Sequence, residues 1–269
     1  MTISFLQRLR AGLPFILSGK LKRVIRLNRH ELLDEFDRVP SHLNPGFLHI
    51  ERAIDLVRHL GLSKDVAIVD VGAASGDTAL TLANAFPDAP VYCFEPIPAA
   101  FQELRRQTAE HRRIIAKQVG LASSAGEGTM FLTHRITSSS LLRPVVDIHD
   151  SYLAANLRAQ REQSITLSTL DSELEAVGSI NLMKLDVQGY ELEVLKGGPL
   201  TLRRTNMVLV EMQNHNIYQQ APRYYEVDAY LREAGFRLFS TTPSIVRNRK
   251  TYEWDAIYVN ESIARRYDT

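Results

Sequence analysis

Short apolar runs alternate with amphipathic stretches through most of the chain, a pattern typical of strands connected by helices. The run VAIVDV, residues 66–71, is apolar apart from one acid, as expected of a strand buried on both faces of a sheet. This alternation predicts an α/β fold, with a mostly parallel sheet and helices on both of its faces. Further strands are predicted at 91–95, 114–119, 180–186, 206–212, 236–241 and 254–259, and helices at 44–60, 77–86, 97–109, 189–197 and 223–234.

One segment breaks this rhythm. Residues 134–162 show neither period clearly, and we interpret them as a loop inserted at an edge of the sheet, where it could cover a bound substrate. Its consecutive serines could bind polar groups of a ligand, or the segment could be a plain polar loop. These serines are Ser138, Ser139 and Ser140. Three tyrosines after the fifth strand could form the opposite wall by stacking on a ring, or could pack their helix against the core. They are Tyr218, Tyr224 and Tyr225.

Composition and charge narrow the classes of function. The chain has 269 residues, of which 45% are hydrophobic and 23% charged, an ordinary balance for a globular protein. The formal net charge of +1 gives no general attraction to polyanions, so no nucleic-acid partner is expected. The single cysteine, Cys93, excludes an internal disulfide and suits a reducing compartment, so we expect a cytoplasmic location.

Charge is uneven at the N-terminus, where we place an extension at residues 1–43 ahead of a domain at 44–269. Basic residues from Arg8 to Arg29 precede the first acid, Glu31, and apolar residues recur between them at helical spacing. No apolar run there is long enough for a signal peptide or a spanning helix. This basic amphipathic helix could cover the domain or a partner subunit, or could lie peripherally on an anionic membrane. We therefore keep two alternatives for this extension, namely assembly into a homo-oligomer and a membrane-peripheral location.

Small residues follow the first strand, in the stretch VDVGAASGDTA at residues 69–79. Small side chains permit a tight turn into a helix and let a ligand approach the backbone, while the helix N-terminus offers free amides. Glu95, followed by Pro96, ends the second strand, where a carboxylate can accept hydrogen bonds from ribose hydroxyls. Together these features predict an adenosine-containing ligand. The residues of the turn are Asp70, Gly72, Ala73, Ala74 and Gly76.

The identity of this ligand depends on two positions in the turn. NAD usually requires G-x-G-x-x-G beside its pyrophosphate, but here Ala74 replaces the middle glycine and Asp70 precedes the turn. A carboxylate is unfavourable near a pyrophosphate and suits the ammonium group of S-adenosylmethionine. We therefore favour the methyl donor, with a nicotinamide-dependent oxidoreductase and a non-catalytic Rossmann-like binding protein as alternatives.

Several motifs occur in an order that resembles the FkbM family of S-adenosylmethionine-dependent methyltransferases. They are VDVGAASGDTA (69–79), FEP (94–96), STLDSEL (168–174), MKLDVQGYELEVLKGG (183–198) and VLVEM (208–212). The resemblance covers roughly residues 45–260. It implies a Rossmann-like class I methyltransferase fold of seven strands, the last antiparallel, and O-methylation of a hydroxyl on a sugar, glycan or small natural product.

The resemblance also implies roles for individual residues around the donor. It puts Gly72, Ala73 and Gly76 beside the methionine part of the donor and Glu95 on its ribose. The segment VGLASSAGEG, residues 119–128, corresponds to the adenine-side loop, and the residues nearest the base are Gly120 and Ser123.

Candidate catalytic residues follow the fourth and fifth strands. Asp186 lies where an acceptor must approach the methyl group, and it could accept the hydroxyl proton or orient the hydroxyl. Glu191, in the next helix, could reach the same cleft. After the fifth strand come Glu211 and His215, and we take His215 as the first candidate for the base because histidine titrates near neutral pH. Mg²⁺ bound by Asp186 and Glu211 with Asn214 is an alternative way to acidify the hydroxyl.

Overall fold

The computed structural model describes residues 48–63, 65–145, 155–215, 217–242, 245–247 and 250–267. The N-terminal extension expected at 1–43 lies outside these residues. In the part described, an eight-stranded sheet has the order β10-β11-β8-β7-β1-β2-β3, and β9 also pairs with β11. No helix among the described residues is long and apolar enough to cross a membrane.

The parallel core of the sheet confirms the α/β architecture expected from the sequence. Strands β1, β2, β3, β7 and β8 pair in parallel, and β11 runs antiparallel to β8. The chain order reverses at β1, which lies between β2 and β7, and ligands of such sheets bind at this switch point. The short strand β10 is an addition to the seven strands expected. The strands are β1 (Ala67–Val71), β2 (Val91–Phe94), β3 (Ile114–Lys117), β7 (Ile180–Leu185), β8 (Thr205–Gln213), β9 (Phe236–Thr241), β10 (Ile245–Arg247) and β11 (Lys250–Asn260).

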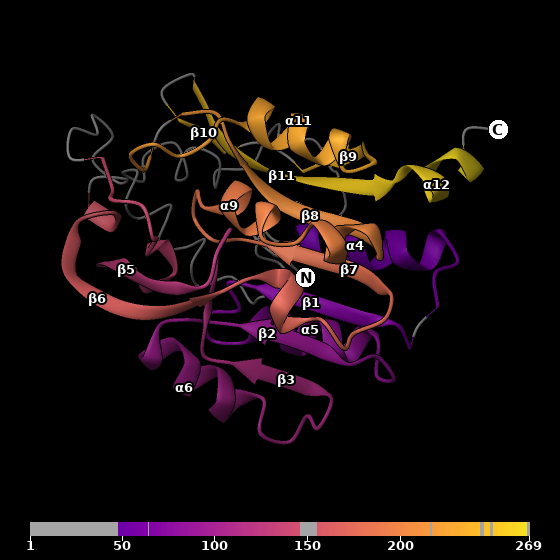
Figure 1. The fold of residues 1–269 in the computed structure, drawn as a ribbon, viewed down its shortest axis with the longest axis horizontal. Helices are drawn as coiled ribbons and strands as arrows, with labels where there is room; N and C mark the ends of the chain where they lie inside the picture. The colour runs from indigo at the N-terminus through magenta and orange to yellow at the C-terminus, as the bar shows by residue number, and fades with distance from the viewer. Residues whose placement is uncertain are drawn as a thin grey trace, which may run out of the picture. The chain divides into compact units, whose positions relative to one another are not determined.

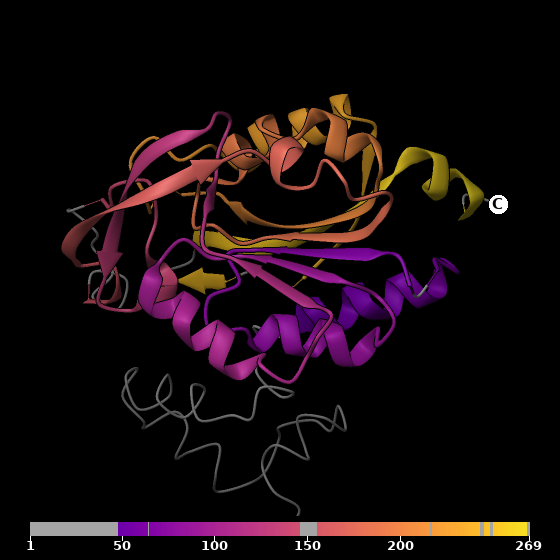
Figure 2. The ribbon, with the colours of Figure 1, turned by 60° about the horizontal axis from the view of Figure 1, so that its bottom comes forward.

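Helices cover both faces of this sheet (Figure 2). One face packs against α4, α5 and α6 through apolar residues such as Ile54 and Leu82, and the other packs against α9 to α11 through residues such as Leu195 and Leu231. All of β1 and β7 is buried, as their continuous apolar runs predict. The helices are α4 (Leu48–His59), α5 (Asp77–Ala85), α6 (Pro98–Gln107), α8 (Leu170–Glu173), α9 (Glu191–Lys196), α10 (Pro199–Arg203), α11 (Tyr224–Glu233) and α12 (Glu261–Ala264).

A second, three-stranded sheet lies beyond the carboxyl ends of the parallel strands (Figure 1). It consists of β4 (Gly120–Leu121), β5 (Gly126–Thr133) and β6 (Ala159–Ser168), with the 3-10 helix η3 (Ile136–Ser138) after β5. The interpretation of 134–162 as a loop was therefore incomplete, because β6 begins within it. Apolar and polar residues alternate along β5, for example at Met130 and Leu132, and along β6. This alternation does not predict that the two strands pair, because pairing between strands far apart in sequence depends on tertiary contacts.

Candidate active site

The turn after β1 contacts the tip of β7 through the backbone. Gly72 has φ 78°, and a Cβ there would lie 2.0 Å from the carbonyl oxygen of Asp186. The amide of Asp186 in turn donates to the carbonyl of Val71 at 3.2 Å. A side chain at Gly72 is thus excluded by the neighbouring strand tip. The turn that is predicted to bind the methyl donor therefore lies beside the residue whose carboxylate is predicted to meet the methyl acceptor.

Hydrogen bonds fix the rest of this turn against the end of β2. The amides of Gly72 and Ala73 both donate to the carbonyl of Phe94, at 3.0 and 3.1 Å. Ala74 has a left-handed φ of 47°, and Gly76, with φ 99°, directly precedes α5. A Cβ at Gly76 would meet Leu104 Cδ1 at 2.8 Å, so this glycine allows close packing against α6. The turn is held in place before any ligand binds.

Glu95 connects this turn to the next one. Its Oε2 accepts from the amide of Ala74 at 2.9 Å and its Oε1 from the amide of Ile97 at 2.8 Å. The residue is 4% exposed, and burial raises the pKa of its carboxyl to about 7. Each carboxylate oxygen has a further lone pair, so Glu95 can hold both amides and still accept from a ligand hydroxyl. Pro96, the next residue, lies beside Gly120.

Asp70 lies beneath the turn and is fully buried. Its Oδ1 is 3.3 Å from the ammonium of Lys184, the residue opposite it on β7. Burial raises the pKa of Asp70, although the Lys184 charge opposes this shift. The structure thus places Asp70 in an internal ion pair, and its contact with a donor ammonium stays a prediction.

Of the two residues expected on the adenine side, one is buried and the other is exposed. Gly120 is buried, and a Cβ there would meet Leu167 and Ile165 of β6 within 3.0 Å. Ser123 is exposed, and its hydroxyl donates to Oε2 of Glu193 at 2.7 Å. Both positions lie beside the small sheet and α9, and contact with an adenine stays a prediction.

Polar side chains meet at the tip of β7 and the end of β8. The Gln188 amide nitrogen lies 2.9 Å from Oδ1 of Asp186 and 3.4 Å from Oε2 of Glu211. Gln213 donates to the same Glu211 oxygen at 3.3 Å. Asp186 and Glu211, predicted from separate strand ends, are therefore bridged by the Gln188 amide, and Gln213 holds Glu211 in addition.

The two carboxyl groups have opposite electrostatic surroundings. Burial alone would raise the pKa of Asp186, but the Lys184 ammonium at 3.5 Å and the Gln188 amide hold it below its usual value. Burial raises the pKa of Glu211 well above its usual value, and the nearby carboxylates of Glu253 and Asp186 raise it further. Asp186 therefore favours its anion, whereas Glu211 holds a proton more tightly than a free carboxyl group.

The Glu191 side chain accepts hydrogen bonds from the backbone of the turn that precedes it. It is 2% exposed, and its Oε1 accepts from the amides of Val187 and Gly189, at 3.0 and 3.1 Å. Burial raises the pKa of its carboxyl to about 7. Its Oε1 thus holds the backbone that carries Gln188, and a contact between Glu191 and the acceptor stays a prediction.

His215 lies on the β11 side of this region. Its ring is 5.1 Å from the ring of Tyr252, measured between centroids. The side chain of Asn214 donates to the Thr251 carbonyl, so it turns toward β11 as well. Among the described residues, no group of His, Cys, Asp and Glu is arranged to hold a metal ion. The role of His215 as a base stays a prediction.

Two polar residues of this region were not predicted from the sequence. Lys184 is 4% exposed and donates to the carbonyl of Gly72 at 3.5 Å, besides its two carboxylate neighbours. His49 of α4 lies 3.1 Å from Asp255. A lysine within the apolar run INLMKL was the available signal for the first, whereas nothing local distinguishes the second.

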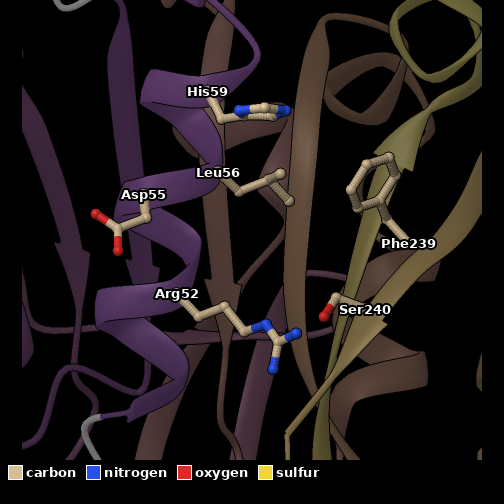
Figure 3. Close-up of a pocket in the computed structure, with 6 residues that line it drawn as sticks. All are labelled: Arg52, Asp55, Leu56, His59, Phe239 and Ser240. Carbon is tan, nitrogen blue, oxygen red and sulfur yellow. The ribbon is translucent and has the colours of Figure 1, made fainter. Parts of the chain in front are cut away.

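A separate groove of about 560 Å³ lies between α4 and the strand β9 (Figure 3). Arg52 and His59 of α4 face Phe239 and Ser240 across it. None of the candidate donor or catalytic residues lines it. We therefore place the candidate active site at the strand tips.

Comparisons with known proteins identify the family of this chain. Residues 70–238, more than half of the chain, match the family described as the Methyltransferase FkbM domain. Hexuronic acid methyltransferase AglP of Haloferax volcanii is 31% identical over 156 residues, covering 55% of this chain and 56% of that protein. The 2-O-methyltransferase NoeI of Sinorhizobium fredii is 26% identical over 164 residues, covering 58% of this chain and 66% of that protein. This chain thus spans little more than half the length of the Haloferax protein.

Among solved structures, magnesium protoporphyrin IX methyltransferase (ChlM) from Synechocystis PCC 6803 aligns over 96% of this chain and 98% of its own. The TM-score is 0.49 and the sequence identity 12%.

Proposed function

Because the chain belongs to the FkbM methyltransferase family, we propose that it is an S-adenosylmethionine-dependent O-methyltransferase. Its acceptor would be a hydroxyl of a sugar, a glycan or a small natural product. Two relatives whose names specify methylation of a hexuronic acid and 2-O-methylation support this choice. The observation that carries the proposal is the backbone contact between Gly72 and Asp186, because the turn that we propose binds the methyl donor then lies beside a partly exposed carboxylate.

The residues of the first turn fit the donor. Small side chains from Gly72 to Gly76 leave the backbone accessible at the start of α5, and Glu95 keeps a lone pair on each oxygen for a ribose hydroxyl. When bound, S-adenosylmethionine supplies a methyl group on a positively charged sulfur. The chain then has to position the acceptor oxygen and accept its proton.

Asp186 is the residue that we propose contacts the acceptor. Its side chain is 37% exposed and anionic, so it can accept a hydrogen bond from a hydroxyl and orient the oxygen lone pair toward the methyl group. A carboxylate of low pKa is a weak base. We therefore keep His215 as the candidate for taking the proton. Glu211, whose raised pKa favours its protonated form, is the candidate donor to a neighbouring acceptor oxygen.

Calorimetry tests donor binding. We expect S-adenosylmethionine to bind and NAD to give no heat of binding. Methyl transfer is then measured by mass spectrometry on a panel of neutral and acidic sugars, with the Asp186→Asn variant as control. Binding of NAD in place of the methyl donor would contradict the proposal and favour an oxidoreductase. A His215→Ala variant with full turnover at every pH would remove His215 as the base.

A further inference from the structure

Gln188 occupies an unusual backbone position beside both carboxyl groups. Its φ of 58° is left-handed, a conformation that residues with side chains rarely adopt. This conformation directs the side chain back to the tip of β7, where its amide nitrogen reaches Asp186 and Glu211. A single NH₂ group has two donor hydrogens, so it can serve both carboxyl groups at once.

Tyr218 contacts the oxygen end of this amide. Its hydroxyl lies 2.9 Å from Oε1 of Gln188 and 2.8 Å from the carbonyl oxygen of Ser138, so the two oxygens share its one hydrogen. The ionised Asp186 carboxylate only accepts, so it sets the amide nitrogen toward Asp186 and the amide oxygen toward Tyr218. Burial, with the nearby Glu211, raises the pKa of Tyr218 well above its usual value, so the hydroxyl keeps that proton.

A segment of the small-sheet insertion holds the same turn from the other side. We call residues 138–145 the arm. Within it, the Ser140 hydroxyl donates to the carbonyl of Gln188 at 2.8 Å. The amide of Gln219 donates to the carbonyl of Arg143, also at 2.8 Å, and Pro144 pairs with Tyr218. Three segments that are far apart in sequence therefore form one hydrogen-bonded unit. They are the arm, the loop that carries Tyr218 and the turn that carries Gln188.

We propose that Gln188, held at its oxygen end by Tyr218, is a positioning residue that fixes the Asp186 carboxylate toward the acceptor and joins it to the arm. The proposal rests on the proposed function for the identity of the acceptor, but not for the link between the three side chains. The amide stabilises the anion of Asp186 and leaves its second oxygen, Oδ2, beside Lys184.

Other charged groups also act on Asp186, and the test has to separate them from Gln188. Lys184 on β7 and His49 on α4 favour its anion, whereas the carboxyl groups of neighbouring elements oppose it. These opposing groups are Asp70 on β1, Glu191 on α9 and Glu211 on β8. None of them is changed in the variants chosen below.

The test is a carbon-13 NMR titration of aspartate carboxyl groups in the full chain, with Asp186→Asn assigning the resonance. Gln188→Met removes the amide at similar size, and we expect it to raise the apparent pKa of Asp186 by about one to two units. Tyr218→Phe leaves the amide in place but removes the hydroxyl that holds its oxygen end, and we expect a smaller rise in the same direction. A general loss of structure would instead disturb the other aspartates too.

Matched controls exist in the chain. Gln220 has a φ of 60° and is exposed, so Gln220→Met repeats the backbone and the substitution away from Asp186. Tyr230→Phe removes a hydroxyl that donates to the carbonyl of Leu195. Both controls should titrate as the wild type. If Gln188→Met fails to fold, Tyr218→Phe carries the test.

The titration of Asp186 does not depend on whether S-adenosylmethionine binds. Failure of the wild type to bind S-adenosylmethionine would reject the proposed function, while the titration would still decide the role of Gln188. An unchanged Asp186 titration in both Gln188→Met and Tyr218→Phe would overturn the proposal.

Discussion

At the scale of single residues, the candidate site depends on buried carboxyl groups with different partners. Glu95 and Glu191 each accept from two backbone amides, and each is almost fully buried. Asp186 is the exception, because its side chain is partly exposed and stabilised as an anion by Lys184 and Gln188. Asp186 is therefore the carboxylate that we propose meets the acceptor, whereas Glu95 and Glu191 both support the backbone.

Replacing Glu95 tests the ribose contact. Glu95→Gln keeps the shape of the side chain but removes its charge and one acceptor. We expect donor binding to weaken by ~1.5–3 kcal/mol, the usual loss for hydrogen bonds to a charged group. Calorimetry with S-adenosylmethionine measures the change, and the exposed Glu110→Gln serves as control. Unchanged affinity would reject the ribose role.

The raised pKa of Glu191 predicts a pH dependence of stability. A carboxyl whose pKa rises from its ordinary value of 4.5 to about 7 on folding binds its proton more tightly in the folded state. Its contribution to the free energy of unfolding therefore falls as pH rises from about 4.5 to about 7, by up to roughly 3 kcal/mol. The free energy of unfolding, measured by urea denaturation at a series of pH values, should fall less steeply with pH over this window for Glu191→Gln than for the wild type. Identical slopes would contradict the assignment.

At the scale of elements, the site is made by turns that leave parallel strands at the same edge of the sheet. The turn after β1 and the turn after β7 meet where the strand order reverses. Glycine is required at Gly72 because the neighbouring turn occupies the space of a Cβ. The precision of the site thus comes from backbone packing between the two turns.

Gly72→Ala should be severely destabilising. It combines a left-handed φ of 78° with a Cβ placed 2.0 Å from the Asp186 carbonyl oxygen. We expect a loss of about 3 kcal/mol or more in the free energy of unfolding. Gly61→Ala isolates the backbone effect, because its φ is 59° but nothing lies within 4 Å of its Cβ, and it should cost roughly 1 kcal/mol. Equal losses for the two variants, measured in urea, would contradict the role of the contact.

At the scale of the whole molecule, the small sheet and the main sheet are joined at the candidate acceptor site. The arm contacts the Gln188 turn and the loop that carries Tyr218. These contacts involve both side chains and backbone, so the acceptor wall is part of the folded structure among the residues described. The acceptor is therefore expected to meet a preorganised surface.

Removal of divalent metals should leave methyl transfer intact. The Asn214 side chain, needed as a third ligand beside Asp186 and Glu211, donates to the Thr251 carbonyl. Methyl transfer is measured after dialysis against a chelator, with and without added Mg²⁺. Loss of activity that Mg²⁺ restores would contradict this expectation.

Much of the donor side could be read from local patterns. The buried strand before Asp70, the small residues after it and Glu95 at the next strand end are neighbours in sequence, and short apolar runs fix where strands end. The acceptor side could be read only in part. Asp186 and Glu211 were expected at strand tips, but the network that connects them depends on Gln188 and Tyr218, which come from different turns.

The sequence by itself determined the order of strands and helices, and with it the edge of the sheet at which functional residues gather, because burial requires the apolar runs to form that sheet. The tertiary structure decided what each of these residues does. Glu191 supports its own turn and Asp70 pairs with Lys184, since hydrogen bonds and ion pairs between elements depend on distances that no local pattern contains.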